Sequence, residues 1–252
     1  MGNFAEKLEK QLKPLYKKLV EDVKNIQGPK DAFAVQWGKD YPTNNNEGIM
    51  FVGRATNQWH TTEENIDVLF GDPADGNTIF NCDDQMIWVE HCWNGTNYQT
   101  KRSAFWRVIR RVSQYYYPVN ENNPCNDLEH VAWSNICKTQ KDSGKNPSGR
   151  IFDNQIVRCQ EIFKVELDVL SPKFVVMFVG NFGKREILSY LNGGDMPTMI
   201  ERVPWNSNNV NGYNICVYKI DSTIFLCTEH PQGKDESSHV KCLISLINKY
   251  SK

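Results

Sequence analysis

The feature that most constrains this sequence is an uninterrupted apolar run at residues 174–180, Phe-Val-Val-Met-Phe-Val-Gly. A strand built from this run has no polar face, so it must be covered on both sides, as the central strands of a parallel sheet are. The run is far shorter than the roughly 18 apolar residues of a membrane span. It therefore predicts a buried central strand with helices on both faces of its sheet.

Helix-like and strand-like patterns alternate along the rest of the chain. Apolar residues spaced three and four apart predict amphipathic helices, and short apolar runs predict strands. We expect helices at 3–26 (kinked or divided at Pro14), 105–116, 151–170, 183–191 and from 240 onward, and strands at 48–53, 131–136, 174–180, 214–220 and 223–228. On the helix at 105–116 the arginines should lie away from the apolar stripe. This alternation predicts an α/β protein, a three-layer α/β/α sandwich with a mostly parallel central sheet.

Length and charge restrict the domain organisation and the class of partner. The 252 residues carry 29 basic and 30 acidic side chains, a net charge of −1, which excludes nucleic-acid binding through bulk positive charge but not through a local patch. We expect a single domain, 1–252, with an N-terminal helical extension at 1–28 and a long loop-rich insertion at 57–100. No membrane span or signal peptide is recognisable, so we expect a cytoplasmic monomer that does not bind membranes.

The eight cysteines are scattered through the chain and form no C-x-x-C pair. Several lie within apolar runs, where cysteine acts as a small buried hydrophobe. We therefore expect reduced thiols, no structural metal and no cofactor. A metal site that includes Cys82, His91 and Cys92 is the weaker alternative.

Three segments should meet at one edge of the predicted sheet. Residues 53–59, 135–138 and 229–231 each follow a predicted strand, and ligands of such sheets bind beyond the carboxyl ends of the strands. His230 could donate a hydrogen bond to developing negative charge, and Asn135 offers the donor and acceptor needed to read a pyrimidine edge. A strand-end histidine that caps a carbonyl and a turn-forming asparagine are the structural alternatives.

The loop at 53–57 supplies the remaining candidates of this edge. Gly53 would let a ligand approach the backbone closely, although a simple turn glycine would look the same. The side chains that follow it are placed to bind anions or to orient a water molecule: Arg54, Thr56 and Asn57.

The order of these segments resembles the uracil-DNA glycosylase superfamily over residues 48 to 250. Gly53-Arg54-Ala55-Thr56 occupies the place of the first family motif, and His230-Pro231-Gln232-Gly233 that of the last. Asn135 matches the asparagine that reads the flipped pyrimidine. The sequence departs from the family at Ala55, where several branches carry a water-activating Asp or Asn, and at Thr56, where the family has proline.

The resemblance implies a DNA glycosylase that takes part in DNA repair. It would hydrolyse the N-glycosidic bond of a flipped uracil or a related damaged base, with DNA as its partner and no cofactor. His230 would stabilise the base anion, and Asn57, Glu63 or Glu64 would place the water. Trp59 or Phe80 would stack on the base. The candidates for contacts with the DNA backbone are Lys138, Lys141, Lys145, Gln232 and Lys234, with Lys101 and Arg102 as further basic side chains.

Two other functional classes remain open. A catalytically inactive nucleic-acid-binding or protein-interaction module on the same fold is favoured by Ala55 and by the nearly neutral charge. A nucleotide or nucleoside hydrolase of another α/β class is the third reading. The sequence contains neither G-x-x-x-x-G-K nor G-x-G-x-x-G, the phosphate-binding motifs of nucleotide-binding α/β proteins.

Overall fold

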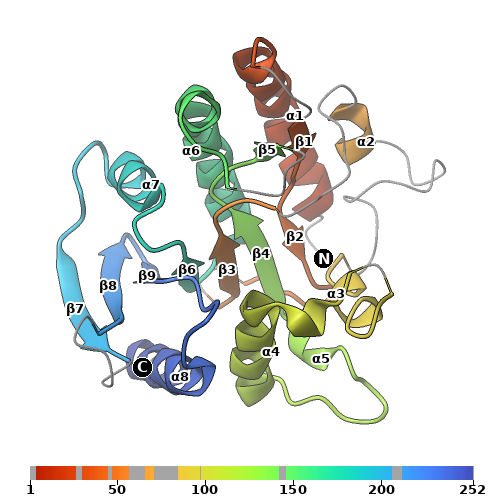
Figure 1. Ribbon diagram of the computed structural model, residues 1–252, viewed down its shortest axis with the longest axis vertical. Helices are drawn as coiled ribbons and strands as arrows, with labels where there is room; N and C mark the ends of the chain where they lie inside the picture. The colour runs from red at the N-terminus through yellow and green to blue at the C-terminus, as the bar shows by residue number, and fades with distance from the viewer. Residues whose placement is uncertain are drawn as a thin grey trace.

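The structure is a computed structural model that describes residues 4–26, 30–44, 47–56, 66–70, 85–96, 98–141, 146–205 and 212–251. A central sheet crosses the molecule, and helices lie on both of its faces (Figure 1). None of the helices in these ranges is both long enough and apolar enough to cross a membrane.

The described residues form a seven-stranded sheet in the order β2-β4-β3-β6-β9-β8-β7. The four inner strands, β4, β3, β6 and β9, run parallel, and the outer strands β2, β8 and β7 pair antiparallel. The strands are β2 Gln36–Trp37, β3 Ile49–Gly53, β4 Val131–Asn135, β6 Phe174–Phe178, β7 Met199–Pro204, β8 Asn214–Ile220 and β9 Thr223–Thr228. A separate antiparallel pair joins β1, Lys30–Ala32, to β5, Thr139–Lys141.

The apolar run at 174–180 is the buried central strand that its composition predicts. Every residue of β6 is buried, between β3 on one side and β9 on the other. The prediction of a mostly parallel sheet is correct for the inner strands and wrong for the outer ones. Only Asp221 and Ser222 separate β8 from β9, and so short a connection joins strands only as an antiparallel hairpin.

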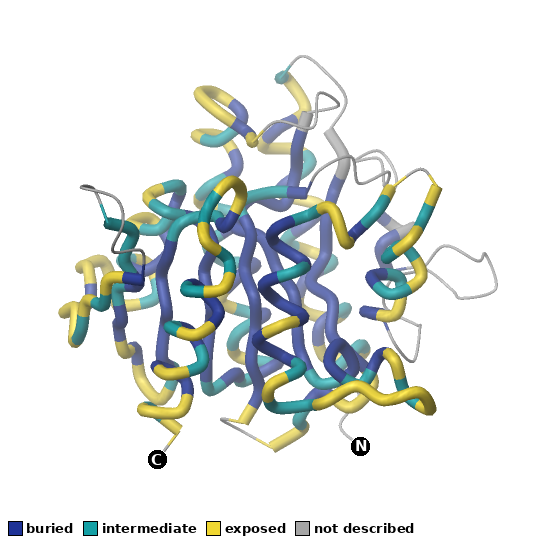
Figure 2. Tube along the Cα trace, turned by 60° about the horizontal axis from the view of Figure 1, so that its bottom comes forward, coloured by how far each residue is buried: buried dark blue, intermediate teal, exposed yellow. Residues whose placement is uncertain are grey.

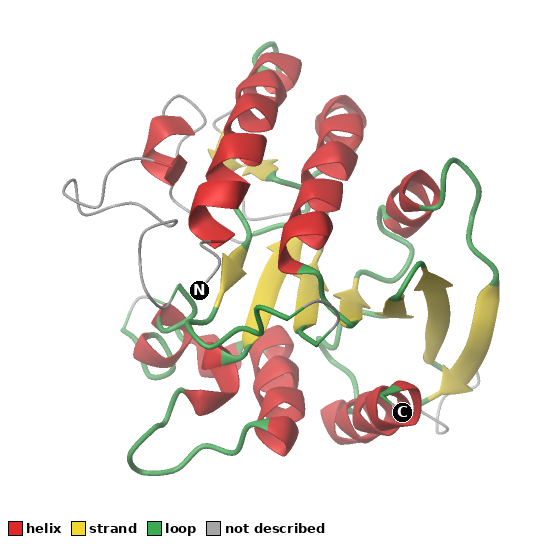
Figure 3. Ribbon diagram, turned by 180° about the vertical axis from the view of Figure 1, so that it is seen from behind, coloured by secondary structure: helices red, strands yellow, loops and turns green. Residues whose placement is uncertain are grey.

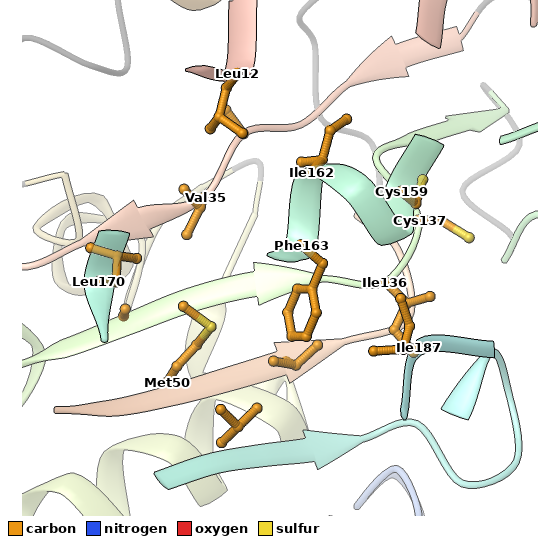
Figure 4. Packing of buried hydrophobic residues seen from close by; sticks show 14 of the residues in the cluster. Leu12, Val35, Met50, Ile136, Cys137, Cys159, Ile162, Phe163, Leu170 and Ile187 are labelled. Carbon is orange, nitrogen blue, oxygen red and sulfur yellow. The ribbon is translucent and has the colours of Figure 1, made fainter. Parts of the chain in front are cut away.

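Alternate residues of the inner strands face two separate cores. Met50 and Val52 of β3 pack into the core under α1, α6 and α7, part of which is shown in Figure 4. Ile49 and Phe51 pack into the opposite core, under α4 and α8. Figure 2 shows the strands as a buried centre between helices whose outer sides are exposed.

The helices divide between these two faces, as Figure 3 shows from behind. The first face carries α1 Phe4–Val23, α6 Arg150–Leu170 and α7 Lys184–Leu191, and the second carries α4 Ala104–Tyr116 and α8 Glu236–Tyr250. Short helices connect them: α2 Ile66–Phe70, α3 Trp88–His91, η4 Thr100–Arg102 and α5 Asn126–Glu129. The long helices lie where the spacing of apolar residues predicts them, so this prediction is confirmed.

The first helix is not divided at Pro14, one of the two outcomes that the sequence allowed, but continues from Phe4 to Val23. Pro14 lies on the exposed side of α1, whereas Leu8, Leu12 and Tyr16 are buried against the body of the protein. A proline removes the hydrogen bond to the carbonyl four residues earlier, here that of Lys10. Lys10 is exposed too, so water can satisfy this carbonyl and the helix passes through.

Arg110 of α4 corrects a second expectation, because it lies in the interior and not on a polar face. Its side chain is 7 % exposed, and its Nε donates to Asp127 of α5 at 2.7 Å. Its guanidinium also pairs with Glu90 of α3 and lies 4.6 Å above the ring of Trp93. A buried arginine is tolerated where carboxylates satisfy its charge, and these come from two other short helices.

Candidate functional site

A cleft of about 970 Å³ opens at the carboxyl ends of the inner strands. Gly53 ends β3, Asn135 ends β4, and His230 follows β9 by two residues. The three segments that the sequence placed at this edge therefore lie around one cavity. Its described lining comprises Gly53, Arg54, Ala55, Thr56, Trp88, Cys92, Gly95, Thr96, Tyr98, Ser103, Phe105, Trp106, Trp133, Asn135, Asn146, His230, Gln232 and Lys234.

Gly53 and Asn135 sit side by side on neighbouring strands and fit each other closely. They are register partners in the parallel β3–β4 pair. A Cβ atom at position 53 would lie 2.4 Å from Asn135 Oδ1, closer than any ordinary contact. Glycine is therefore required at position 53 to leave room for the Asn135 amide, a more specific role than that of a turn glycine.

The Asn135 amide has an unused donor. Its side chain lines the cleft and the residue is only 1 % exposed, yet Nδ2 has no hydrogen-bond partner among the described residues. Leaving a buried donor unpaired costs about 1–3 kcal/mol, so nearly all such groups in folded proteins are hydrogen-bonded, to protein or to water. A ligand with an acceptor atom in the cleft would supply the missing bond.

His230 can donate a hydrogen bond from its Nε2 atom. The backbone N–H of Gln232 donates to His230 Nδ1 at 3.2 Å, so a neutral imidazole carries its proton on Nε2. Burial, followed by the nearby charges of Arg54 and Lys234, lowers the pKa of His230 to about 4. At neutral pH the cleft therefore holds a neutral histidine with an Nε2–H group.

Phe105, in the first turn of α4, lines the cleft and is a candidate platform for a stacked ring. Its ring lies nearly parallel to the imidazole of His230, with centroids 6.1 Å apart and an interplanar angle of 11°. A planar ring stacked on Phe105 would therefore be oriented parallel to the imidazole. Hydrogen bonds to a carbonyl oxygen are best made near the plane of that carbonyl, which this orientation favours.

The sequence predicted other aromatic residues for this role. Trp59 and Phe80 lie outside the described residues, as does the predicted catalytic residue Asn57. Phe105 appeared only as a member of the apolar stripe of a helix, and its spacing there is that of any core residue. Only its packing beside His230 distinguishes it.

Two cations line the cleft beside His230. Arg54 is half-buried, its Nε donates to the carbonyl of Val179 at 3.1 Å, and burial lowers its pKa against the opposing effect of Glu229. Lys234 Nζ donates to the carbonyls of His230 at 2.8 Å and Gln232 at 3.3 Å. Within the described part of the chain, neither cation forms an ion pair and no Asp or Glu belongs to the lining. This part of the cleft therefore presents two cationic side chains.

Lys138 does not contact a phosphate, which corrects the prediction for this residue. Its side chain is fully buried, with Nζ 2.8 Å from Glu166 Oε1 and 2.7 Å from Ser134 Oγ. The lysine turns toward α6, where Glu166 satisfies its charge. Nothing local in the sequence distinguishes this buried lysine from a solvated one.

Some of the other predicted site residues line the cleft, and the side chains of the rest are not among those that the structure describes. Thr56, Gln232 and Lys234 line the cavity, while Lys145 is outside the described residues and Lys141 is described only as backbone of β5. Seven cysteines are free thiols, and Cys82 is outside the described ranges. In those ranges no group of three or more His, Cys, Asp or Glu side chains is arranged to hold a metal ion.

No protein-family model matches the chain, and no match was found among curated proteins. Its function is therefore inferred from the cleft and its residues.

Proposed function

We propose that this protein is a DNA glycosylase that hydrolyses the N-glycosidic bond of a flipped uracil or a related damaged base. The observation that carries the proposal is the pair of donors at the carboxyl end of the sheet. Asn135 Nδ2 is buried and unpaired among the described residues, and His230 is held neutral with its proton on Nε2. Both residues line the same cleft.

A nucleobase matches this set of groups. Its flat ring could stack on Phe105, parallel to the imidazole of His230. Its amide-like edge offers an acceptor for Asn135 Nδ2 and a donor for the amide oxygen, the kind of edge by which flipped bases are read. The positive charges of Arg54 and Lys234 suit the phosphates that flank a base in DNA.

The same groups favour departure of the base as an anion. When the base–sugar bond breaks, the sugar becomes oxocarbenium-like and negative charge develops on the base. A neutral His230 can donate its Nε2–H to that charge, and the nearby cations Arg54 and Lys234 add electrostatic stabilisation. Water would attack the sugar from the loop after β3, where Thr56 lines the cleft.

The topology is compatible with the proposal. The asparagine strand β4 lies beside the glycine-loop strand β3, and the histidine follows β9, with β6 between β3 and β9. Segments far apart in the chain are thereby brought to one edge of the sheet, where a ligand could contact all of them. Ala55, in place of a water-activating Asp or Asn, keeps the inactive binding module as the rival function.

A base-release assay tests the proposal. Oligonucleotides that contain uracil, hypoxanthine, xanthine or mismatches are incubated with the protein, and free base is measured. His230→Ala should slow release by about 10²–10³-fold, since one donor to developing charge is lost. Asn135→Ala should weaken discrimination between bases. His91→Ala is the matched control, because His91 is an exposed histidine that does not line the cleft.

The possible results separate the candidate functions. Full activity of His230→Ala would reject the mechanism. No base release by the wild type, together with binding of the oligonucleotides, would favour the inactive binding module.

A further inference from the structure

We infer that Cys216 and Cys227 are a redox-active thiol pair, which a small disulfide such as oxidised glutathione converts into a disulfide bond within the protein. The pair lies in the hairpin of β8 and β9, away from the described lining of the cleft (Figure 1). Both cysteines are free thiols in the structure. The inference does not depend on the proposed function and follows from strand register, from unequal burial of the thiols and from a neighbouring cation.

The first observation is that the two cysteines are directly opposite each other. They are register partners in the antiparallel β8–β9 pair. Directly opposed residues of such a pair have Cα atoms about 4.5–5.5 Å apart, within the roughly 4.4–6.8 Å that a disulfide spans. Opposed side chains leave the same face of the sheet, and here both pack against the core under α1, α6 and α7. A bond between them therefore needs only a small adjustment of the two strands.

The two thiols differ in access, which sets the order in which they react. Cys216 is partly exposed, whereas Cys227 is 2 % exposed and its Sγ lies 3.7 Å from Met177 Sδ. Burial raises the pKa of the Cys227 thiol to about 12, against the opposing charge of Lys184. A small oxidant therefore meets Cys216 first and leaves Cys227 as the resolving thiol beside it, an arrangement typical of redox-sensitive cysteines.

A cation lies next to the accessible thiol. Arg202 of β7 is the register partner of Cys216 on its other side and is exposed. Burial raises the pKa of Tyr218, two residues along β8 on the face of Cys216, and the charge of Arg202 opposes that rise. The guanidinium thus acts on this face of the sheet. A neighbouring cation favours the thiolate, the form that attacks disulfides, and would attract oxidised glutathione, which is an anion at neutral pH.

The reaction consists of two thiol–disulfide exchanges. The Cys216 thiolate attacks one sulfur of oxidised glutathione, forms a mixed disulfide and releases the first glutathione, which takes up the proton that Cys216 lost. Cys227 then attacks Cys216 Sγ, and the second glutathione leaves with the proton of Cys227. Both protein thiols are oxidised and the glutathione disulfide is reduced to its thiols. The new bond ties β8 to β9 three residues before His230.

Peptide mapping by mass spectrometry tests the inference. The folded full-length protein is incubated with oxidised glutathione, its remaining thiols are alkylated, and the protein is digested without reduction. The wild type should yield a disulfide-linked pair of peptides that contain Cys216 and Cys227. Dithiothreitol should restore both thiols, because thiol–disulfide exchange is reversible.

Substitutions separate the two thiols. Cys227→Ser should leave a stable glutathione adduct on Cys216, because the resolving thiol is gone, whereas Cys216→Ser should leave Cys227 unmodified. Cys242→Ser is the matched control, because Cys242 is a partly exposed cysteine of α8 whose loss should leave the cross-link intact. Circular dichroism verifies that each variant is folded. If Cys227→Ser is unfolded, Cys227→Ala takes its place.

A second pair of variants tests the cation. In the Cys227→Ser background, Arg202→Gln should slow formation of the glutathione adduct on Cys216 by about 2- to 5-fold, since an exposed charge contributes little more. Arg202→Lys should keep most of the rate. An unchanged rate in Arg202→Gln would overturn the role given to Arg202.

The remaining outcomes decide the pairing itself. A cross-link in the wild type together with a trapped adduct in Cys227→Ser supports it. A glutathione adduct that persists on Cys216 in the wild type, or no reaction at Cys216, would overturn it. Cys137 and Cys159 are both buried in the same core. Their oxidation at the same rate would show that the reagent reacts with unfolded protein, and would overturn the inference as well.

Discussion

At the scale of single residues, the site depends on a glycine whose role is steric. Gly53 could be read from the sequence as a point where a ligand approaches the backbone. In the structure, its missing Cβ makes room for Asn135 Oδ1, 2.4 Å from where that Cβ would be. The Asn135 amide is thus positioned by its neighbour on the adjacent strand, and a single methyl group should displace it.

We expect Gly53→Ala to weaken ligand binding and base release as Asn135→Ala does, because the new methyl group pushes the amide out of position. A double-mutant cycle checks this. If Gly53→Ala acts through the amide, it should have little further effect when position 135 is already alanine. Equal effects in both backgrounds would show that Gly53 acts independently of Asn135.

At the scale of secondary-structure elements, a buried ion pair ties the end of β4 to α6. Lys138 Nζ and Glu166 Oε1 are 2.8 Å apart, and the Ser134 hydroxyl donates to Glu166 Oε2 at 2.6 Å. Burial raises the pKa of Glu166, and Lys138 opposes that rise. The backbone N–H of Lys138 also donates to Gln155 Oε1 of α6, and its carbonyl accepts from the N–H of Phe33, so this residue joins three segments.

Removing one partner of this pair should therefore destabilise the fold strongly. We expect Lys138→Met or Glu166→Leu alone to lower the free energy of unfolding by about 3–5 kcal/mol, since one buried group loses its partner. The double variant Lys138→Met/Glu166→Leu should be much closer to the wild type. Urea unfolding of the four proteins measures this. Small, additive losses would mean that the pair is not coupled as the geometry indicates.

At the scale of the whole molecule, two histidines link stability to pH. They are His230, in the loop after β9, and His239, which packs against the end of β9. His239 of α8 is fully buried, its ring stacks on Trp205 with centroids 4.0 Å apart, and its Nε2 lies 3.1 Å from Thr228 Oγ1. Burial, then the charges of Lys234 and His230, lowers its pKa to about 3. The neutral imidazole is therefore the form that the folded protein accommodates.

The pH dependence follows from this lowered pKa. Between about pH 6.5 and 3 the unfolded chain binds a proton at His239 that the folded protein does not, so acid favours unfolding. Stability from this residue is complete above about pH 6.5 and is lost as the pH falls toward 3, a loss on the order of 5 kcal/mol. The lowered pKa of His230 also makes acid destabilise the fold. The raised pKa values of Glu166 and Asp127 make acid stabilise it instead.

A difference measurement isolates His239. The free energy of unfolding of His239→Gln, compared with that of the wild type, should approach or exceed the wild-type value as the pH falls from 6.5 to 3. Chemical unfolding at a series of pH values provides the comparison. A constant difference over this range would show that His239 titrates normally in the folded protein.

The sequence by itself determined those features whose cause is local. The apolar run at 174–180 could only be a covered strand, and the spacing of apolar residues located the long helices to within a few residues. The ends of the apolar runs placed Gly53, Asn135 and His230 at or just after strand ends. The rule that parallel strands release their loops at one edge then brought these residues together. No knowledge of distant contacts was needed for any of these.

Only the tertiary structure decided which polar residues are buried and which aromatic ring faces the cleft. Arg110 and Lys138 look like solvated cations in the sequence, but carboxylates from distant segments satisfy them in the interior. Phe105 has the spacing of a core residue, and only the approach of the loop after β9 places His230 beside it. Burial and pairing are properties of what surrounds a side chain, and those surroundings come from parts of the chain that local patterns do not connect.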